Sequence, residues 1–430
     1  MNNALLKLER YLFYFFLFAI PFQTRKILYH PGWLFNEWQG VFIYGTDLLL
    51  AVLFIFWMFD FKIKFSKTDY FLVAFVIISG ISIKNSSAMY LSFYSLLKLI
   101  EFVIFYFYIK NYALQKFDRL GLLLALICGG LFQSVIAIVQ FFRQEDLGLR
   151  LLGESVLNLD TRGIASFISS SGEKIIRSYG TAPHPNVLAG YLLLAIFAFY
   201  AVYAGFHKKF ASSVVHIPAS MIYGLILFGF FFTFSRAIIG IWGVLFIIGT
   251  ALIFKYKKEH LKALQELLIM TAIFSFIFLA VYWPAVSSRL TLNANDEALT
   301  MRVFYNNESL RSGTNIFGVG TGNFVNWLIE KNPNLPPWLY QPVHNIYLLV
   351  YSETGILGIG ALILFIVFLF RDFLKGAFFR SGGGYAILFP FVAVLLVGLS
   401  DHFLWTLQEG RLIFWLSAGL LTPLLKTRSK

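Results

Sequence analysis

Residues 215–254 read VHIPASMIYGLILFGFFFTFSRAIIGIWGVLFIIGTALIF, and Arg236 is the one Asp, Glu, Lys or Arg among them. The break at Ser235-Arg236 divides this stretch into two apolar runs of about 20 residues, the length that a helix needs to cross the hydrocarbon core of a bilayer. A membrane β-strand would need only about 10 residues of alternating polarity. The stretch therefore predicts two consecutive transmembrane helices, 215–233 and 235–254, joined by a very short turn.

The whole chain has the composition of a membrane protein. Of its 430 residues, 58% are hydrophobic and only 13% are charged, and the mean hydropathy is +0.73. A soluble domain carries about 25% charged residues, so this composition excludes a soluble enzyme, a disordered chain and, with the single Cys128, a disulfide scaffold. We predict an all-α polytopic membrane protein that forms one domain over residues 1–430. Its twelve expected spans are 6–21, 46–60, 69–83, 90–109, 120–142, 187–205, 215–233, 235–254, 262–283, 345–370, 385–400 and 411–425.

The distribution of positive charge predicts how these spans are oriented. With the N-terminus in the cytoplasm, most of the 35 Lys and Arg residues fall on the cytoplasmic side. The short outer loops carry only Arg25, Lys26, Lys84, Arg236 and Arg411. Both termini are therefore expected in the cytoplasm and two long loops, 143–186 and 284–343, in the periplasm. This bias and the attraction of anionic lipid headgroups account for the net charge of +13, so we expect membrane lipids and no nucleic acid as partners.

The second long loop, 284–343, is expected to contain helices of its own. Residues 295–312 are charged and amphipathic, and Phe324, Trp327 and Leu328 recur at helical spacing. Gly318-Val319-Gly320-Thr321-Gly322 resembles a phosphate-binding loop, but no strand precedes it and no Lys-Ser/Thr follows it. We therefore interpret this glycine-rich segment as a tight turn between the two loop helices.

One ion pair is expected inside a span. Lys98 and Glu101 are three residues apart in the fourth span, so they should face each other on the helix. A structural bridge is the favoured interpretation and a proton relay is the alternative. The sequence shows no His, Cys and Asp cluster with metal-ligand spacing and no Asp-x-Asp motif. We expect neither a metal nor a cofactor.

Three polar side chains at the expected outer ends of the spans are candidates for chemistry. A guanidinium at the hydrocarbon edge, as expected for Arg236, needs a partner such as a ligand anion, although it could also extend to a lipid headgroup. Arg177 precedes a turn that leads to a helix N-terminus, a favourable place for an anion, or it is a solvated loop arginine. His344 opens the tenth span and could be a neutral base, a cap or a satisfied core residue. His184 and His402 are weaker candidates for the same role.

Around these residues the sequence resembles the O-antigen ligase/polymerase superfamily, which comprises lipopolysaccharide O-antigen ligases, O-antigen polymerases and related O-oligosaccharyltransferases. The resemblance runs in order from about residue 160 to 425, whereas the N-terminal third matches only as hydrophobic spans. The matching elements are Arg-x-x-Gly-Thr…Pro-Asn at 177–186, Ser-Arg at 235–236, Gly-x-Gly-x-Gly-Asn-Phe at 318–324 and His-Asn…Glu-x-Gly-x-x-Gly at 344–358.

The resemblance implies a metal-independent glycosyltransferase of the bacterial inner membrane, multi-pass, with its active site at the periplasmic face. The implied donor is a glycan carried on undecaprenyl diphosphate. By motif position, Arg177 and Arg236 would bind the diphosphate and His344 would act on the acceptor hydroxyl, and these three are the expected catalytic residues. Asn345 is a further candidate for substrate binding.

Arg302 and Arg311 are candidate substrate contacts from the long loop. The sequence does not decide which acceptor the enzyme uses. The acceptor is lipid A core in a ligase, a second lipid-linked glycan in a polymerase, and a protein hydroxyl in an oligosaccharyltransferase. Overall resemblance favours O-antigen ligation. A non-catalytic polysaccharide lipid transporter or flippase is the alternative from another class, but we find no internal repeat of the kind that many transporters show.

Overall fold

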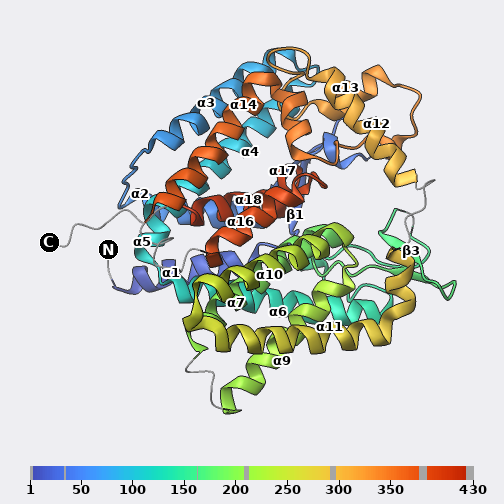
Figure 1. Cartoon of the computed structure of the whole chain (residues 1–430). Coiled ribbons are helices and arrows are strands. Elements are labelled where there is room, and N and C mark those ends of the chain that lie inside the picture. Colours follow the sequence, from blue (N-terminus) through green and yellow to red (C-terminus); the bar gives the residue numbers. More distant parts are fainter. Residues whose placement is uncertain are drawn as a thin grey trace.

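The computed structural model describes residues 3–32, 35–161, 163–207, 213–290, 297–376 and 385–422, and these are mostly helical (Figure 1). A helix lies at each of the twelve expected ranges, although the last one, 411–425, runs past the described residues. The helices in question are α1 (Asn3–Ala19), α2 (Gly45–Met58), α3 (Lys67–Ser82), α4 (Met89–Tyr108), α6 (Arg119–Arg143), α7 (Pro185–Gly205), α9 (Ser213–Phe232), α10 (Arg236–Tyr256), α11 (Leu261–Leu290), α14 (Ile346–Lys375), α16 (Tyr385–Val397) and α18 (Gln408–Leu420).

The structure supports a multi-pass membrane protein without confirming the count of twelve spans. Within the described residues, 7 helices are long and apolar enough to cross a membrane, in segments that begin at Lys67, Met89, Arg119, Pro185, Arg236, Lys258 and Ile346. Three shorter apolar helices, Gly45–Met58, His216–Phe232 and Ile387–Val397, add to them. The helices α1 and α18 are in neither group, so the twelve spans and the direction of the termini stay predictions.

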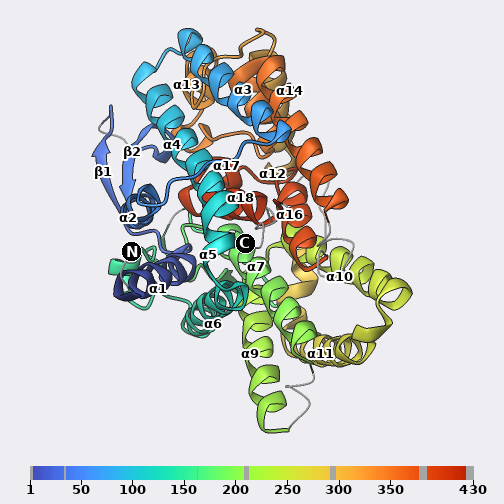
Figure 2. The same cartoon turned by 90° about the vertical axis from the view of Figure 1, so that its left-hand side faces the viewer.

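The all-α class is wrong in one respect, because the described residues include two small antiparallel sheets. Strands β1 (Arg25–Tyr29) and β2 (Val41–Tyr44) pair in one, and β3 (Ser166–Ile168) and β4 (Lys174–Ile176) in the other. The β1–β2 hairpin lies at the side of the helices, beside α2 (Figure 2). Strands of three to five residues carry too little pattern to stand out between apolar runs of about 20 residues.

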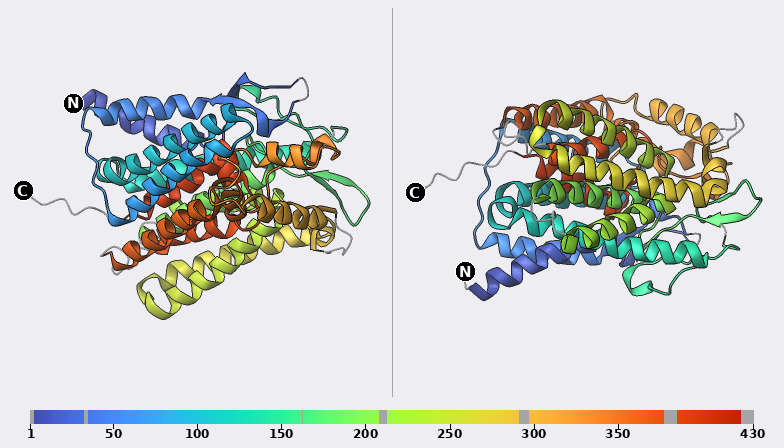
Figure 3. Two further views of the ribbon diagram at one scale, coloured as in Figure 1. Left: turned by 90° about the horizontal axis from the view of Figure 1, so that it is seen from above. Right: turned by 60° about the horizontal axis from the view of Figure 1, so that its bottom comes forward.

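Short helices complete the chain between these elements. They are η1 (Glu37–Gln39), η2 (Ile83–Asn85), the π-helical turn η3 (Ile109–Ala113), α5 (Leu114–Lys116), η4 (Arg150–Leu152), η5 (Lys258–His260), α12 (Glu297–Ser312), α13 (Phe324–Lys331), η6 (Pro337–Leu339) and α17 (Phe403–Thr406). The two helices expected in the long loop are therefore confirmed as α12 and α13. Together with the β3–β4 hairpin they lie at one end of the helix bundle, away from the start of α1 (Figures 1 and 3).

The helix before the long loop is longer than the expected span 262–283. Helix α11 continues from the expected span through Pro284 to Leu290, with a kink at Tyr282, where φ is −109° and ψ is 22°. A proline inside a helix usually ends or bends it, and here the helix bends and goes on. Residue 284, where the loop was expected to start, therefore lies inside α11. Residues 291–296 of the loop lie outside the described part of the chain.

The glycine-rich segment is a tight turn between α12 and α13, as expected. Gly318, Gly320 and Gly322 all have positive φ, at 67°, 103° and 72°. The turn packs against α14 where that helix is broken at Gly355, whose φ of 67° and ψ of −169° are not helical. The break leaves carbonyl groups of α14 without helical partners, and Val319 and neighbouring Gly320 donate their N–H groups to the carbonyls of residues 352 and 353.

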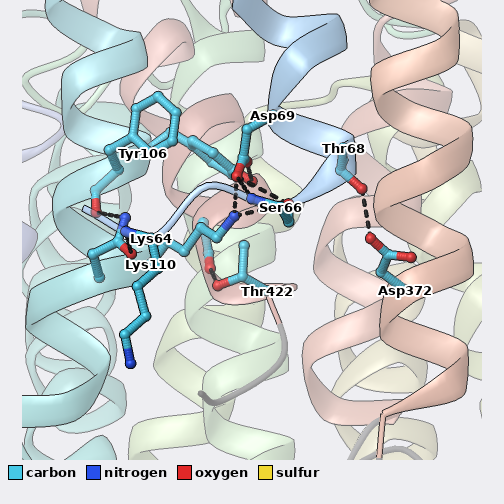
Figure 4. Close-up of polar contacts among 11 residues, drawn as sticks. Lys64, Ser66, Thr68, Asp69, Tyr106, Lys110, Asp372 and Thr422 are labelled. Carbon is cyan, nitrogen blue, oxygen red and sulfur yellow. Dashed lines mark hydrogen bonds and ion pairs between the residues drawn. The ribbon is translucent and has the colours of Figure 1, made fainter.

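Two buried lysines inside the bundle form ion pairs. Lys98 contacts Glu101 as expected, at 2.7 Å, and also contacts Asp47 at 2.7 Å. A second buried pair, Lys110 with Asp69, lies beside the start of α3 (Figure 4). Because a charge inside a membrane protein is costly unless it is paired, these contacts have a structural explanation.

Candidate active site

Arg177 is held in a buried position between two loops. It follows β4, and its backbone N–H bonds to the carbonyl of Ala165. Its Nε donates to the carbonyl of Thr233 at 2.7 Å and its Nη2 to Oδ1 of Asn186 at 2.6 Å, while the residue is only 8% exposed. The interpretation of Arg177 as a solvated loop arginine is therefore wrong.

The turn between α9 and α10 places Arg236 beside this loop. Phe234 adopts φ of 45°, a left-handed conformation that is uncommon for a bulky residue, and its buried ring packs among aromatic residues of α6, β3 and α11. Arg236 starts α10 two residues later, is exposed, and donates from Nη1 to the carbonyl of Arg289 at 3.2 Å. A strained backbone of this kind is common at functional sites.

Three arginines thus lie close to one another. Burial lowers the pKa of Arg177 to about 9, and the positive charges of Arg289 and Arg236 contribute to that lowering, whereas Tyr179 and Asp401 oppose it. Arginine at this pKa is still charged at neutral pH. Like charges gathered in one place are stabilised by an anion, and the planar guanidinium groups suit phosphate oxygens.

Asn186 and Asp401 connect the arginines to a group of histidines. The Oδ1 of Asn186 accepts from Arg177 and from Ser235, and its Nδ2 donates to Oδ2 of Asp401 at 2.6 Å. Asn186 lies in the first turn of α7, and Asp401 lies in the short connection between α16 and α17. The side-chain amide of Asn186 therefore links the guanidinium of Arg177 to the carboxylate of Asp401, which comes from a distant part of the chain.

His344 and His402 lie next to Asp401. One ligand-type atom from each of the three residues lies within 4.8 Å of the others, and the two imidazole rings are 4.9 Å apart. His402 bonds to Thr406 through Nδ1 at 2.8 Å. Among the described residues, the buried Nδ1 of His344 has no hydrogen-bond partner, so the protein itself leaves this nitrogen unsatisfied.

Burial keeps the imidazoles neutral. It lowers the pKa of His184 and of His402 to about 3. It also lowers the pKa of His344, an effect that Asp401 opposes and the positive charge of Arg302 reinforces. Burial alone would raise the pKa of Asp401, but the neighbouring imidazoles and the hydrogen bond from Asn186 outweigh it and hold that pKa below its usual range. A neutral imidazole next to an ionised carboxylate is suited to accept a proton.

The remaining candidates are not all in the same place. Arg302 is exposed on α12 and close enough to His344 to affect its pKa. Arg311 is on the same helix but pairs with Glu308 at 2.8 Å. Asn345 caps α14: its Oδ1 accepts from the N–H groups of residues 347 and 348, and its Nδ2 donates to the carbonyl of Leu399. Asn345 thus fixes the backbone next to His344.

The weaker candidate His184 also has a structural role, because its Nδ1 accepts the N–H of Asn186 and caps α7. Its charge interactions with Asp401 and His344 place it in the same cluster.

His344, Asp401 and His402 form the one group in the described part of the chain that could hold a metal ion. Two imidazoles and a carboxylate are chemically suited to a divalent transition metal. However, the Nδ1 of His402 and the Oδ2 of Asp401 already have protein partners. The expectation that no metal is needed stays a prediction.

Sequence reasoning missed Asp401 and Arg289. Asp401 directly precedes His402, a weaker candidate for the base, and is one of only 22 acidic residues in the chain. An acidic residue between two expected spans was the signal that could have identified it. Arg289 was assigned to the loop, whereas it lies in the last turn of α11.

A comparison with known protein families gives a match in the C-terminal half of the chain. Residues 219–363 match the family model described as O-antigen ligase. This range contains Arg236, His344 and Asn345, and Arg177 and Asp401 lie outside it. No curated protein matches the chain. The resemblance seen in the sequence is confirmed over the matched range, and members of this family transfer glycans from lipid-linked substrates.

Proposed function

We propose that this protein, whose residues 219–363 match the O-antigen ligase family model, is a metal-independent glycan transferase of the bacterial inner membrane. It transfers an oligosaccharide or polysaccharide from undecaprenyl diphosphate to an acceptor hydroxyl at the periplasmic face. Ligation of O-antigen to lipid A core is the favoured reaction, and O-antigen polymerisation by the same chemistry is the alternative.

One observation carries this proposal: a continuous set of hydrogen bonds joins Arg177 through Asn186 to Asp401, which lies beside His344. A diphosphate leaving group requires positive charge, and an acceptor hydroxyl requires a base. The two requirements are met by neighbouring groups that come from widely separated parts of the chain.

The arginines act on the donor. As the bond between the sugar carbon and the diphosphate oxygen breaks, negative charge grows on the departing lipid diphosphate. Arg177 and Arg236, with Arg289 nearby, are placed to stabilise that charge without a metal ion. Losing one such donor typically lowers the rate by about 10²–10³-fold.

His344 acts on the acceptor. Its free Nδ1 takes the proton of the acceptor hydroxyl while the hydroxyl oxygen forms the new glycosidic bond. The resulting imidazolium faces the carboxylate of Asp401, which stabilises its charge and holds the ring in place.

The first test is transfer by the purified chain with undecaprenyl-diphosphate glycan and lipid A core. His344→Ala should lower the rate about 10²–10⁴-fold, the usual contribution of a general base, with unchanged folding. His216→Ala is the matched control, because His216 lies near Glu266 at the other end of α9. Activity retained in His344→Ala would contradict the assigned role.

The same assay separates the alternatives. A ligase joins the glycan to lipid A core, and a polymerase joins it to a second lipid-linked glycan. A flippase forms no new glycosidic bond with either acceptor, and that result would contradict the proposal as a whole.

A further inference from the structure

One cavity of the described residues lies outside the candidate active site. It has a volume of about 400 Å³ and is enclosed by α6, α7, α10, α11 and α16, which is a size typical of ligand pockets. On α10 the lining residues Leu245, Gly249 and Ile253 are spaced four apart, so they form one face of the helix, and Lys257 directly follows the helix. The end of the cavity at Lys257 is about 30 Å from Arg236 by the rise of a helix.

The cavity is apolar along its length and basic at its mouth. Its walls are mostly aliphatic and aromatic, while Arg119, Lys257 and His260 line one end. None of the described residues that line it is acidic. Lys257 forms an ion pair of 3.9 Å with Glu259, whose side chain is mostly exposed. Arg119 and Lys257 thus give the described lining two cationic side chains.

The length of the cavity matches one leaflet of a bilayer. From Leu245 to Lys257 the helix rises about 18 Å, and half of the hydrocarbon core is about 15 Å. Small residues provide the space, and a side chain added at Gly205 of α7 would meet no other atom within 4 Å. Lipid has access to this side of the bundle, because 22% of the span in α10 and 28% in α11 are buried, against 83% in α7.

We propose that this cavity binds an anionic membrane phospholipid, with its phosphate at Arg119, Lys257 and His260 and one acyl chain along the apolar slot. Basic pockets between transmembrane helices are known to favour anionic headgroups. A neutral lipid would bring no net negative charge to the basic mouth, and a soluble anion would leave the slot unfilled. The site is independent of the proposed reaction, since none of these residues belongs to the candidate active site.

The test is native mass spectrometry of the delipidated full chain with added dioleoyl phosphatidylglycerol or dioleoyl phosphatidylcholine. We expect a preference for phosphatidylglycerol that falls about 30-fold in the double variant Arg119→Ala, Lys257→Ala, at about 1 kcal/mol for each charge near the membrane surface. Lys255→Ala is the matched control, because Lys255 is exposed on α10 and does not line the cavity.

A second variant tests the slot without changing its charge. Gly205→Leu should fill the open space and abolish binding, whereas Gly243→Leu, also in open space but outside the cavity, should not. The melting temperature of each variant in detergent checks folding. Equal binding of the two lipids, unchanged binding in both cavity variants, or preferential displacement by undecaprenyl phosphate would overturn the proposal.

Discussion

Arg302 is exposed on α12, yet its charge acts on the half-buried ring of His344. Burial lowers the pKa of His344, Asp401 raises it and Arg302 lowers it further. The proton affinity of the proposed base therefore depends on a loop helix as well as on its own surroundings. Motifs alone could identify His344, but they could not show that Arg302 reaches it.

Replacing Arg302 should change the pH dependence of transfer. The neutral base is present above the pKa of His344 and is lost as the pH falls through it. Arg302→Ala removes a lowering influence, so the pKa rises and the acid limb of kcat/KM moves to higher pH. The variant should lose more activity at pH 6 than at pH 8.

Arg311→Ala is the control for that profile, because Arg311 is on the same helix but pairs with Glu308. A profile that shifts equally in both variants, or moves to lower pH in Arg302→Ala, would contradict this electrostatic link.

The two hydrogen bonds of Arg177 predict that a lysine at this position cannot do the work of the arginine in transfer. Its Nε and Nη2 reach Thr233 and Asn186 at the same time, and a lysine ammonium has no planar fork to do so. Arg177→Lys should lower kcat about 10²–10³-fold, whereas Arg143→Lys, in an exposed ion pair with Glu145, should leave it unchanged. Comparable kcat for the two variants would remove Arg177 from the reaction.

At the scale of elements, the length of an apolar run was a reliable signal for a long helix, whereas the small polar elements gave no comparable signal. The apolar runs correctly located α6, α7 and α10. They could not reveal the β1–β2 hairpin, nor that α11 bends at Tyr282 and continues through Pro284. The contact between Asn186 and Asp401 joins residues 215 positions apart, and neither residue carries a local sign of the other.

The break in α14 gives a stability prediction. Gly355 lies in a backbone region that is essentially restricted to glycine, and an added Cβ would overlap the carbonyl of Ile316. Gly355→Ala should destabilise the protein by about 1–3 kcal/mol. Gly360→Ala in the same helix meets nothing within 4 Å and should be neutral or stabilising by up to about 1 kcal/mol. Thermal unfolding in detergent checks both, and equal melting temperatures would contradict the strain argument.

At the scale of the whole molecule, the candidate site is assembled from both halves of the chain. The loop before α7, the α9–α10 turn, the start of α14 and the connection before α17 all contribute side chains. The family match covers two of these four segments. The orientation of the molecule in the membrane and the independence from metal are properties of the whole protein that experiments can test.

Chelation should leave transfer unchanged. If the cluster of His344, Asp401 and His402 works through hydrogen bonds and charge, incubation with EDTA followed by gel filtration should not lower kcat. A loss of activity that added zinc restores would show that this cluster holds a metal.

Cysteine labelling tests the orientation. In a Cys128→Ser background, Glu173→Cys in the loop before α7 should react with a membrane-impermeant maleimide in intact spheroplasts. Lys62→Cys, between α2 and α3, should react only after lysis. Reaction of Lys62→Cys in intact spheroplasts would reverse the predicted topology.

The bonds between the glycine-rich turn and the broken helix have a consequence for exchange with heavy water. The N–H groups of Val319 and Gly320 donate to carbonyls of α14, although both residues belong to a turn outside the expected spans. Their deuterium uptake should be as slow as that of a helix interior. Since main-chain atoms make this connection, it depends on the backbone path of the turn and not on a side chain of the turn. It attaches the loop helices to the membrane helix that begins beside His344.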